Sequence, residues 1–450
     1  MEQGSAARAV RHVLSEAGQP AGTSPPEGRQ RILLIHQNFP GQFRHLAQHL
    51  AARPDVEIIG LGRDSAPGLP GFPWFKYKLH RQGKAETHPY LRQMESAVLH
   101  GQAVVRALQK LKHQGFVPDV ILAHPGWGET LYAKDVFPRA RLIHFCEWYY
   151  TTQGADFDFD PEFPSDLDDR LRIQTWNALH LLNLENCDAA IAPTHWQKSR
   201  FPDAYQDKIQ VIHEGIDTEH LGPDPDATLM LPSGQYLKAG DPVITYVARN
   251  LEPYRGFHLF MRALPAVLKA NPHAQIVIVG GDGKSYGALP KDAPNWREKL
   301  LRELRETQGD ALDVWLPRIH FLGKVPYETY KKVLQVSAVH VYLTYPFVLS
   351  WSLLEAMATG CRIIASDTAP VREVIRDGKN GELVDFFDPD ALSHKILAAL
   401  NDPGRGQALR AAARATAQAY RLDAGLRAYE QLLGLPVVPC VAQPSSGAAV

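Results

Sequence analysis

Two series of short apolar runs constrain the fold of this chain more than any other feature. The first series consists of RILLIH (31–36), VEIIGL (56–61), DVILAH (119–124), ARLIHFC (140–146) and AAIAPT (189–194). Short, nearly continuous apolar runs are typical of strands that are buried on both faces of a parallel sheet. A long amphipathic pattern over 89–114 lies between the second and third runs and predicts a helix. Strands that alternate with helices indicate a doubly wound α/β domain.

The pattern then begins again. A stretch rich in Pro, Gly and Asp over 222–241 is typical of a linker. The second series consists of PVITYVA (242–248), QIVIVGG (275–281), IHFLGKV (319–325), VHVYLTY (339–345) and CRIIAS (361–366). No short repeat joins the two series, which favours two separate sheets over a solenoid.

A chain of 450 residues is also too long for one ordinary core. We therefore predict two Rossmann-like domains that face a central cleft, flanked by less regular ends. The predicted divisions are a disordered leader over 1–29, an acceptor domain over 30–221, a donor domain over 222–415, a helix over 416–436 that can return to the first domain, and a tail over 437–450.

The charge balance excludes one class of partner and leaves another open. The formal net charge of -1 argues against a dedicated nucleic-acid-binding protein, which is usually strongly basic. Residues 31–150 hold 15 Lys/Arg and 9 Asp/Glu, a balance of +6, whereas residues 151–220 hold 5 and 14, a balance of -9. The basic segment suits anionic lipid headgroups or a phosphorylated acceptor. An unevenly charged, solvated surface is the alternative.

Cysteine usage and hydropathy bear on the compartment. Cys146, Cys187, Cys361 and Cys440 are far apart and form neither a zinc-binding spacing nor a disulfide framework. No stretch reaches the roughly 18 to 20 apolar residues that span a bilayer. The first 18 residues lack the apolar region of a signal peptide. We expect a cytoplasmic protein, with peripheral contact at the inner membrane face as an option.

The first candidate site residues lie in VARNLEPYRGF (247–257). A buried strand ends at Arg249, and Arg255 follows beside Gly256. Two permanent cations next to a residue without a side chain suit a pyrophosphate, which is doubly charged and needs close approach. A surface pair of arginines on a strand-to-helix loop is the alternative.

The second candidate is TYPFVLSWSLLEAMATG (344–360), which follows a strand and opens a helix. Ser350 and Ser352 are residues that favour helix starts, where backbone N–H groups point at an anion. Glu355 lies one turn further on, where a carboxylate can accept both hydroxyls of a ribose. A core helix explains Leu353 and Met357 but not the glutamate.

These two motifs, with ASDTAPVREVIRDGKNGELVD (365–385), VGGDG (279–283), HFLGKV (320–325) and HEGID (213–217), resemble the family 4 retaining glycosyltransferases, the group 1 glycosyltransferases of GT-B fold. The resemblance covers about residues 31–430. It implies a metal-independent hexosyltransferase that needs no cofactor and uses a nucleotide diphosphate sugar as co-substrate. Arg249 and Arg255 would bind the donor diphosphate, and Glu355 the ribose. The other donor-binding residues that the resemblance implies are Lys324, Ser350, Trp351, Ser352 and Leu353.

One position departs from the family pattern. The family has two glutamates seven residues apart in this loop, and the first would fall at Phe347. The carboxylate that the family places on the transferred sugar is therefore absent. We expect backbone groups and Ser350 to meet the sugar hydroxyls instead.

In the first domain the resemblance points to two further residues. Gly41 in QNFPGQF (37–43) lies where the family's glycine loop faces the sugar and phosphates, and glycine there permits close approach or a left-handed turn. His124 follows the strand DVILA, at a position where the family's histidine contacts the donor sugar. A plain turn and a structural histidine are the alternatives.

The segment EWYYTTQGADFDFDPEFP (147–164) mixes aromatic and acidic residues directly after a strand. Aromatic faces suit sugar rings or a lipid-linked acceptor, so we place acceptor contacts here. Asp156, Asp158 and Asp160 resemble the metal-binding motif of the other large glycosyltransferase fold, but two arginines already supply charge for the diphosphate. We therefore predict an acidic solvent loop and no metal site.

The sequence thus predicts transfer of a sugar from a nucleotide diphosphate donor to a glycan or lipid-linked acceptor, with retention of configuration, as in polysaccharide biosynthesis. Two alternatives stay open. A nucleotide-sugar epimerase or hydrolase would act on the donor without an acceptor, and an inactive sugar-nucleotide-binding protein would bind without turnover.

Overall fold

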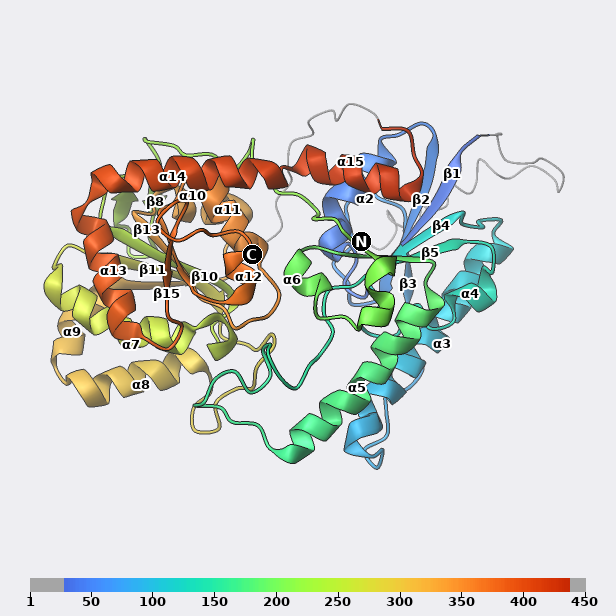
Figure 1. The fold of residues 1–450 in the computed structure, drawn as a ribbon, viewed down its shortest axis with the longest axis horizontal. Helices are drawn as coiled ribbons and strands as arrows, with labels where there is room; N and C mark the ends of the chain where they lie inside the picture. Colours follow the sequence, from blue (N-terminus) through green and yellow to red (C-terminus); the bar gives the residue numbers. More distant parts are fainter. Residues whose placement is uncertain (1–27, 438–450) are drawn as a thin grey trace. The chain divides into compact units, whose positions relative to one another are not determined.

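A computed structural model describes residues 28–437 of the protein. These residues form two compact units (Figure 1). Unit 1 comprises the chain up to Glu214 and the segment from Gly425, and unit 2 comprises Gly215–Ala424. The predicted leader and tail fall almost wholly outside the described residues. Each unit is described here by itself.

Unit 1 is built on a seven-stranded sheet of order β3-β2-β1-β4-β5-β6-β7, and every neighbouring pair is parallel. Its strands are β1 (Gln30–Ile35), β2 (Val56–Arg63), β3 (Trp74–Tyr77), β4 (Val120–Ala123), β5 (Arg141–Phe145), β6 (Ala189–Ala192) and β7 (Ile209–Val211). Its longer helices are α2 (Arg44–Ala51), α3 (Arg92–His113), α5 (Leu167–Asn186) and α15 (Leu422–Leu433), and its short ones are η1 (Gly41–Phe43), η2 (Pro89–Leu91), α4 (Ala133–Val136), α6 (His195–Lys198) and η3 (Asp203–Lys208).

Unit 2 repeats this plan with a six-stranded sheet of order β12-β11-β10-β13-β14-β15, again parallel throughout. Its strands are β10 (Val243–Asn250), β11 (Gln275–Gly281), β12 (Ile319–Gly323), β13 (Val339–Tyr342), β14 (Ile363–Ser366) and β15 (Glu382–Val384). Its helices are η4 (Pro253–Arg255), α7 (Phe257–Ala270), α8 (Trp296–Gln308), α9 (Ala311–Trp315), η5 (Leu316–Arg318), α10 (Tyr327–Gln335), α11 (Trp351–Thr359), α12 (Ala369–Arg372), α13 (Pro389–Asn401), α14 (Pro403–Ala417) and η6 (Gln418–Tyr420).

The doubly wound α/β prediction is confirmed, because each sheet is parallel and helices lie between consecutive strands, except between β2 and β3. The central strands β1 and β10 are fully apolar over most of their length, and Ile32, Leu33, Val243 and Ile244 have no exposed surface. In both sheets the strand order reverses at the first strand of the unit, between β1 and β4 and between β10 and β13. Ligands of such sheets bind beyond the carboxyl ends of the strands at this point.

The stretch over 222–241 is not the linker that its composition predicts. It holds an antiparallel hairpin of β8 (Thr228–Met230) and β9 (Tyr236–Lys238), closed by a turn at Gly234, whose φ is 84°. Leu229 and Leu237 are buried in the core of unit 2. Pro, Gly and Asp mark the turns of this segment, while its few leucines supply enough apolar surface to anchor it.

Helix α5 was not predicted from the sequence. It begins at a capping box, in which the side chain of Asp166 accepts the backbone N–H of Asp169 at 2.8 Å. The acidic residues of this part of the chain therefore do two things: some lie in a loop, and Asp166 and Asp169 cap the start of a helix.

The last helix, α15, belongs to unit 1 from Gly425 onward and lies beside α2 (Figure 1). Glu430 is fully buried and accepts from Arg53 Nη1 at 2.5 Å and pairs with His49 Nε2 at 2.8 Å. Gln30 Nε2 also donates to the carbonyl of Leu433 at 2.8 Å. These bonds attach the end of the chain to the first unit.

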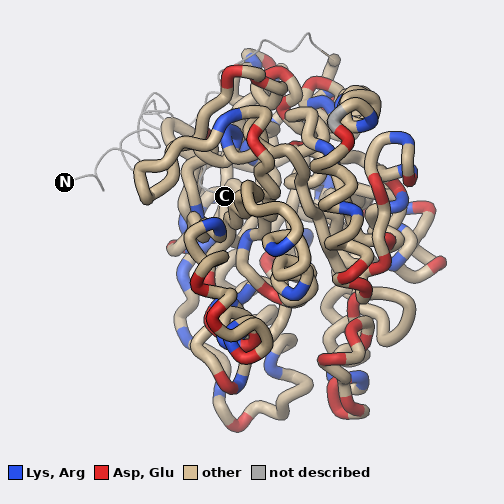
Figure 2. The backbone as a smooth tube through the Cα atoms, turned by 90° about the vertical axis from the view of Figure 1, so that its left-hand side faces the viewer, with Lys and Arg blue, Asp and Glu red and all other residues tan. Residues whose placement is uncertain are grey.

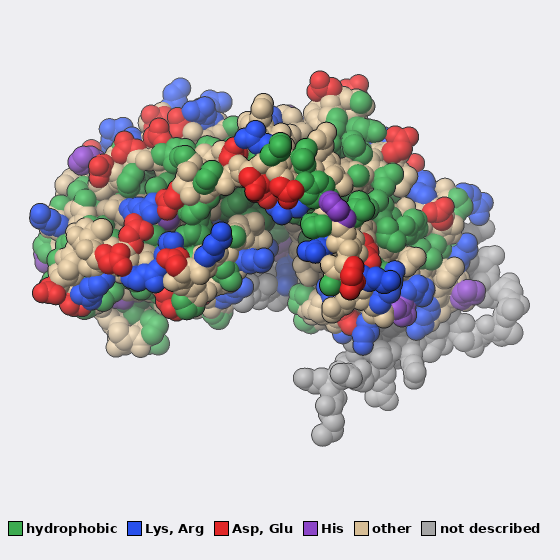
Figure 3. All heavy atoms as spheres, turned by 90° about the horizontal axis from the view of Figure 1, so that it is seen from below, with side chains coloured by type: hydrophobic (Ala, Val, Ile, Leu, Met, Phe, Trp, Pro, Cys, Tyr) green, Lys and Arg blue, Asp and Glu red, His purple; other side chains and the backbone are tan. Residues whose placement is uncertain are grey.

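Charges of both signs are interspersed along the backbone of each unit (Figure 2) and on the face seen in Figure 3. No helix among residues 28–437 combines the length and the apolar character that a membrane crossing requires. Cys146, Cys187 and Cys361 are buried free thiols.

Candidate functional site

The candidate residues of unit 2 lie at or after the carboxyl ends of β10, β12 and β13. The turn that carries Arg255 begins directly after β10, where Glu252 O accepts the N–H of Arg255 at 3.1 Å. Gly256 follows with φ 66°, and a Cβ there would lie 2.4 Å from Cβ of Leu343. Only glycine therefore fits between the turn and the end of β13.

The guanidinium of Arg255 is buried without a carboxylate partner. It is 8% exposed, and its Nη1 donates to Thr344 Oγ1 at 2.7 Å and to the carbonyl of Val348 at 3.0 Å. Its Cζ lies 5.5 Å from the ring centroid of Tyr286. Among residues 28–437, no acid pairs with it, and its other polar neighbours are the hydroxyl of Tyr342, 3.4 Å from Nη1, and that of Tyr286. A buried cation is costly unless a counter-charge meets it, so this group is suited to hold an anion.

The two other predicted cations of unit 2 are exposed. Arg249 is the penultimate residue of β10, and its side chain forms no hydrogen bond or ion pair within the described part of the chain. Lys324 follows β12 and is also exposed. A Cβ on Gly281 would lie 2.8 Å from Cε of Lys324, so the lysine stem runs across the end of β11. Both charges are thus available at the same edge of the sheet as Arg255.

Helix α11 starts at this edge, as the sequence predicts. Ser350 is its N-cap, and Ser350 Oγ accepts the N–H of Ser352 at 3.3 Å. The N–H of Ser350 donates to the hydroxyl of Tyr342 at 2.9 Å. Trp351 is half-buried and packs against the core, and Leu353 is completely buried. Both residues therefore anchor the helix start, and Leu353 can offer a ligand only its backbone.

Glu355 lies on the first full turn of α11. Its Oε2 accepts the hydroxyl of Tyr330 at 2.7 Å, and its Oε1 accepts the hydroxyl of Tyr327 at 3.2 Å. Burial raises the pKa of this carboxyl, and the two tyrosine hydroxyls act in the opposite direction. The residue as a whole is half-buried, and the two tyrosines fix the orientation of its carboxylate.

Phe347 is buried within an aromatic group that surrounds the Arg255 turn. Its ring centroid lies 4.9 Å from that of Tyr286 and 5.6 Å from that of Tyr254. Tyr254 in turn stacks on Tyr345 at 4.6 Å. The position where the resemblance implies a carboxylate is therefore occupied by apolar packing.

In unit 1 the candidate residues also lie at the carboxyl edge, after β1 and β4. Gly41 opens η1 with φ 51°, and a Cβ there would lie 2.4 Å from the ring of His36. The glycine thus allows the loop after β1 to fold over the His36 ring. His124 follows β4, is 5% exposed and stacks on Trp127, with ring centroids 4.6 Å apart.

His124 belongs to a chain of polar contacts. Its Nδ1 accepts the N–H of Gly126 at 3.2 Å, so its Nε2 carries the proton and donates to Glu147 Oε2 at 3.2 Å. Gln42 Nε2 donates to the other carboxylate oxygen at 3.0 Å. Gln42 Oε1 accepts from His36 Nε2 at 2.7 Å. Glu147 thereby fixes the ring of His124 and the loop that carries Gly41.

Sequence reasoning missed Glu147 and Gln42 as members of this group. Both lie in segments that it singled out, QNFPGQF and EWYY, but it assigned Gly41 to the first and acceptor contacts to the second. The one available indication was a carboxylate directly after a buried strand. The pairing of Glu147 with His124 could not be predicted, because it depends on β4 and β5 lying side by side as parallel strands.

A second polar group lies beneath the same edge. Glu129 is fully buried, and its Oε1 accepts from the hydroxyl of Tyr77 at 2.7 Å and from Gln37 Nε2 at 3.2 Å. Its Oε2 has no hydrogen-bond partner within residues 28–437. Burial raises the pKa of Glu129 and lowers that of the adjacent His100 to about 4.

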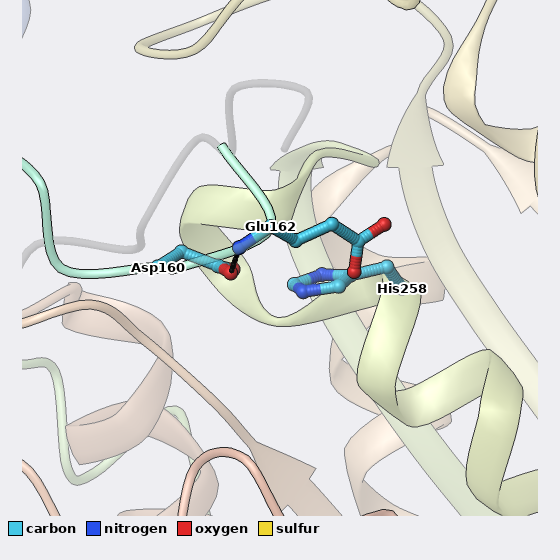
Figure 4. Close-up of side chains that lie close together, drawn as sticks. All are labelled: Asp160, Glu162 and His258. Atoms are coloured by element: carbon cyan, nitrogen blue, oxygen red, sulfur yellow. Dashed lines mark hydrogen bonds between the residues drawn. The ribbon is translucent and has the colours of Figure 1, made fainter. Parts of the chain in front are cut away.

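The acidic loop after β5 is held by its own carboxylates. Asp158 has φ 57°, accepts the N–H of Ser165 at 3.0 Å and pairs with Arg170 at 2.9 Å. Asp160 Oδ1 accepts the N–H of Glu162 at 3.0 Å (Figure 4). These bonds give Asp158 and Asp160 a structural role in shaping the loop.

Comparison with known proteins extends over both units. Residues 54–221 match the family model described as glycosyl transferase family 4 group, and residues 233–416 match the model described as glycosyl transferases group 1. The first match covers β2 to β7 but not β1 or the loop that carries Gly41, and the second covers the whole sheet of unit 2.

Two similar proteins come from Mycolicibacterium smegmatis. The GDP-mannose-dependent alpha-(1-6)-phosphatidylinositol monomannoside mannosyltransferase is 28% identical over 234 residues, which is 51% of this chain and 57% of that protein. The phosphatidyl-myo-inositol mannosyltransferase is 30% identical over 235 residues, 50% of this chain and 52% of that protein. The matches thus span about half the length of these relatives.

Solved structures match nearly the whole chain. The sucrose-phosphate synthase of Thermosynechococcus elongatus superposes with a TM-score of 0.66 and 20% identity over 90% of this chain and 98% of that one. HepE of Anabaena, solved with UDP-glucose, gives 0.61 and 17% over 90% and 100%. At such identities the likeness shows the fold, which is GT-B as expected. With its two matching models and this fold, the chain belongs to the family 4, group 1 glycosyltransferases.

Proposed function

We propose that this protein transfers a sugar from a nucleoside diphosphate sugar to a hydroxyl of a glycan or lipid-linked acceptor. The observation that carries the proposal is Arg255, a buried guanidinium that no acid among the described residues neutralises. Arg249 and the start of α11 at Ser350 lie at the same carboxyl edge. A diphosphate is an anion that such a site can bind.

Each group has a distinct task in the transfer. Arg249, Arg255 and Lys324 neutralise the charge that develops on the leaving diphosphate, and such preorganised electrostatics is usually the largest catalytic contribution. The N–H groups at the start of α11 add partial positive charge. Glu355, oriented by Tyr327 and Tyr330, accepts the ribose hydroxyls.

The bond changes are those of a retaining transfer. The bond between the anomeric carbon and the diphosphate oxygen breaks, and a bond forms between that carbon and the acceptor oxygen on the same face of the sugar. The acceptor proton passes to the leaving phosphate oxygen. His124, held by Glu147, contacts the sugar, and Gly41 lets backbone groups approach it. The arginines make a divalent metal ion unnecessary.

The names of the relatives suggest the substrates. Those relatives are GDP-mannose-dependent or act on phosphatidylinositol, and HepE was solved with UDP-glucose. From these names we infer that the donor of this protein is a guanosine or uridine diphosphate sugar and that its acceptor carries an inositol or a lipid. Such an acceptor would place the protein at the inner face of a membrane through peripheral contact.

A thermal-shift screen with uridine, guanosine and adenosine diphosphate sugars tests the proposal, followed by turnover with and without acceptor and chelator. A ligand at 100 times its Kd stabilises a protein by about 2.7 kcal/mol. We expect one donor to stabilise the chain, acceptor-dependent release of its diphosphate, and no loss with EDTA. Release without acceptor would indicate a hydrolase or epimerase, and stabilisation without release an inactive binding protein.

A further inference from the structure

The loop that follows β11, over 282–287, is held in place by hydrogen bonds to one buried carboxylate, that of Glu252. Glu252 is 1% exposed, and its carboxylate accepts the backbone N–H groups of Ser285 at 3.2 Å, Tyr286 at 3.2 Å and Gly287 at 3.1 Å. No cation among residues 28–437 pairs with it. Three consecutive N–H groups that converge on one anion form a nest, a concave arrangement that backbone adopts around negative charge.

Glu252 also shapes the turn that carries Arg255. Its carbonyl accepts the N–H of Arg255 at 3.1 Å, while its side chain holds the loop from the neighbouring strand. A second fastening comes from Asn250, whose Nδ2 donates to Ser285 Oγ at 2.8 Å. The ends of β10 and β11 are therefore joined through two residues of the segment RNLEPYR (249–255).

The hydrogen bonds of Glu252 and Asn250 with this loop set the position of Tyr286. Its ring lies 5.5 Å from Cζ of Arg255 and 4.9 Å from the ring of Phe347, yet 40% of the residue is exposed. Gly283 and Gly287 flank the loop, and glycine permits many backbone conformations. Without the Glu252 carboxylate, nothing within the loop's own backbone would hold the tyrosine against the arginine.

We propose that Glu252 is a positioning residue of the donor site and that Tyr286 is a donor-specificity residue that contacts the sugar diphosphate. The proposal rests on the proposed function, because it takes the anion on Arg255 to be that diphosphate. The ring lies against the guanidinium, which keeps water away from the cation and so strengthens its attraction to an anionic ligand. The phenol and the adjacent Phe347 present the sugar with an aromatic wall and one hydroxyl, where a carboxylate would have paired with several sugar hydroxyls.

Amide hydrogen exchange tests the positioning role without any need for turnover. Ser285, Tyr286 and Gly287 should exchange slowly in the intact protein and at least about 10-fold faster in Glu252→Ala, because bonds to a charged acceptor are lost. Glu252→Gln should show a smaller increase. Glu303→Gln on helix α8, which breaks an ion pair with Arg262 of α7, is the matched control and should leave these amides unchanged. Equal exchange in the wild type and Glu252→Ala would overturn the role of Glu252.

Steady-state kinetics and binding test Tyr286. Tyr286→Ala should raise KM for the nucleotide sugar about 10-fold and shift the ratio of kcat/KM between donor sugars, while the affinity for the nucleoside monophosphate changes less than about 2-fold. Tyr286→Phe, which keeps the ring, should restore KM but not the preference between sugars. Unchanged KM and preference in Tyr286→Ala would overturn the specificity role. If the wild type binds neither UDP nor GDP, the proposed function fails, and so does the specificity role of Tyr286. The hydrogen-exchange experiment would still show whether Glu252 holds the loop over 282–287 in place.

Discussion

Arg255 Nη1 lies 2.7 Å from Oγ1 of Thr344, so a neutral hydroxyl, and not a carboxylate, orients the buried cation. A carboxylate in that place would neutralise the arginine before any ligand arrived. A hydroxyl fixes its direction and leaves its charge in place. The first prediction follows from this relationship.

Arg255→Ala should lower transfer at least about 100-fold, the scale of a lost oxyanion donor. Arg255→Lys should recover only part of this loss, because an ammonium cannot donate in the same planar geometry. The measurement is kcat and kcat/KM with saturating acceptor. Arg305→Ala, which removes an exposed arginine paired with Asp313 on unit 2, is the control. Near-normal turnover of Arg255→Ala would show that the diphosphate binds elsewhere.

Arg249→Ala should separate activity from stability. The side chain is exposed and has no partner among residues 28–437, so its removal should change the free energy of unfolding by no more than about 0.5 kcal/mol. Transfer should still fall about 100-fold. Urea denaturation and donor kinetics on the same preparation check both parts. A variant that transfers at the wild-type rate would remove Arg249 from the donor site.

Glu147→Gln should weaken the hold on His124. A glutamine offers one acceptor oxygen where two donors, from His124 and Gln42, now meet a carboxylate. The loss of one hydrogen bond to a charged group, about 1.5 to 3 kcal/mol, corresponds to roughly a 10- to 100-fold fall in kcat/KM. His124→Ala should be no less affected.

The control for this pair is Glu57→Gln, which breaks an ion pair with Arg31 at the other end of the sheet's first strands. It should leave kinetics unchanged. A normal rate in both Glu147→Gln and His124→Ala would assign the contact to folding alone.

Glu129 should make stability fall as the pH rises. Burial raises its pKa in the folded protein above the ordinary value of 4.5. The folded state therefore binds this proton more tightly than the unfolded state, and the stabilisation is complete below about pH 4.5 and lost as the pH passes the folded pKa. The slope cannot exceed about 1.4 kcal/mol per pH unit for one group.

Glu129→Gln removes this titration while its amide oxygen can still accept from Tyr77 and Gln37. The free energy of unfolding of the variant minus that of the wild type should grow with pH from pH 4.5 upward, as measured by urea denaturation at several pH values. A difference that does not change with pH would mean that Glu129 titrates normally.

Peripheral membrane contact predicts a role for the basic stretch that begins within β3 and continues after it. Lys76, Lys78, Arg81 and Lys84 are exposed there, and none of them pairs with an acid within the described residues. Anionic surfaces attract each such charge with about 1 kcal/mol. Sedimentation with vesicles that contain phosphatidylinositol should recover the wild type, and much less of a variant with Lys76, Lys78 and Arg81 changed to Ser. Equal recovery, or equal binding to neutral vesicles, would contradict the prediction.

The amino-acid sequence by itself determined the fold class and the strongest part of the candidate site. Apolar runs such as RILLIH and PVITYVA identify buried parallel strands because every residue of a strand covered on both faces must be apolar. Arg255 with Gly256, and Ser350 before a helix, could be found because the chemistry depends on neighbours in the chain. The resemblance then supplied roles that these patterns alone do not carry.

Only the tertiary structure decided which distant side chains meet. Gln42 and Glu147 are 105 positions apart, and Glu252 reaches a loop 33 to 35 positions away. Local composition also misassigned 222–241, where a hairpin anchored by Leu229 and Leu237 was expected to be a linker. The physical reason is common to all three cases. A hydrogen bond or a buried leucine depends on the distance between atoms in the folded chain, and parallel strands bring together residues whose separation in the sequence is set by the helices between them.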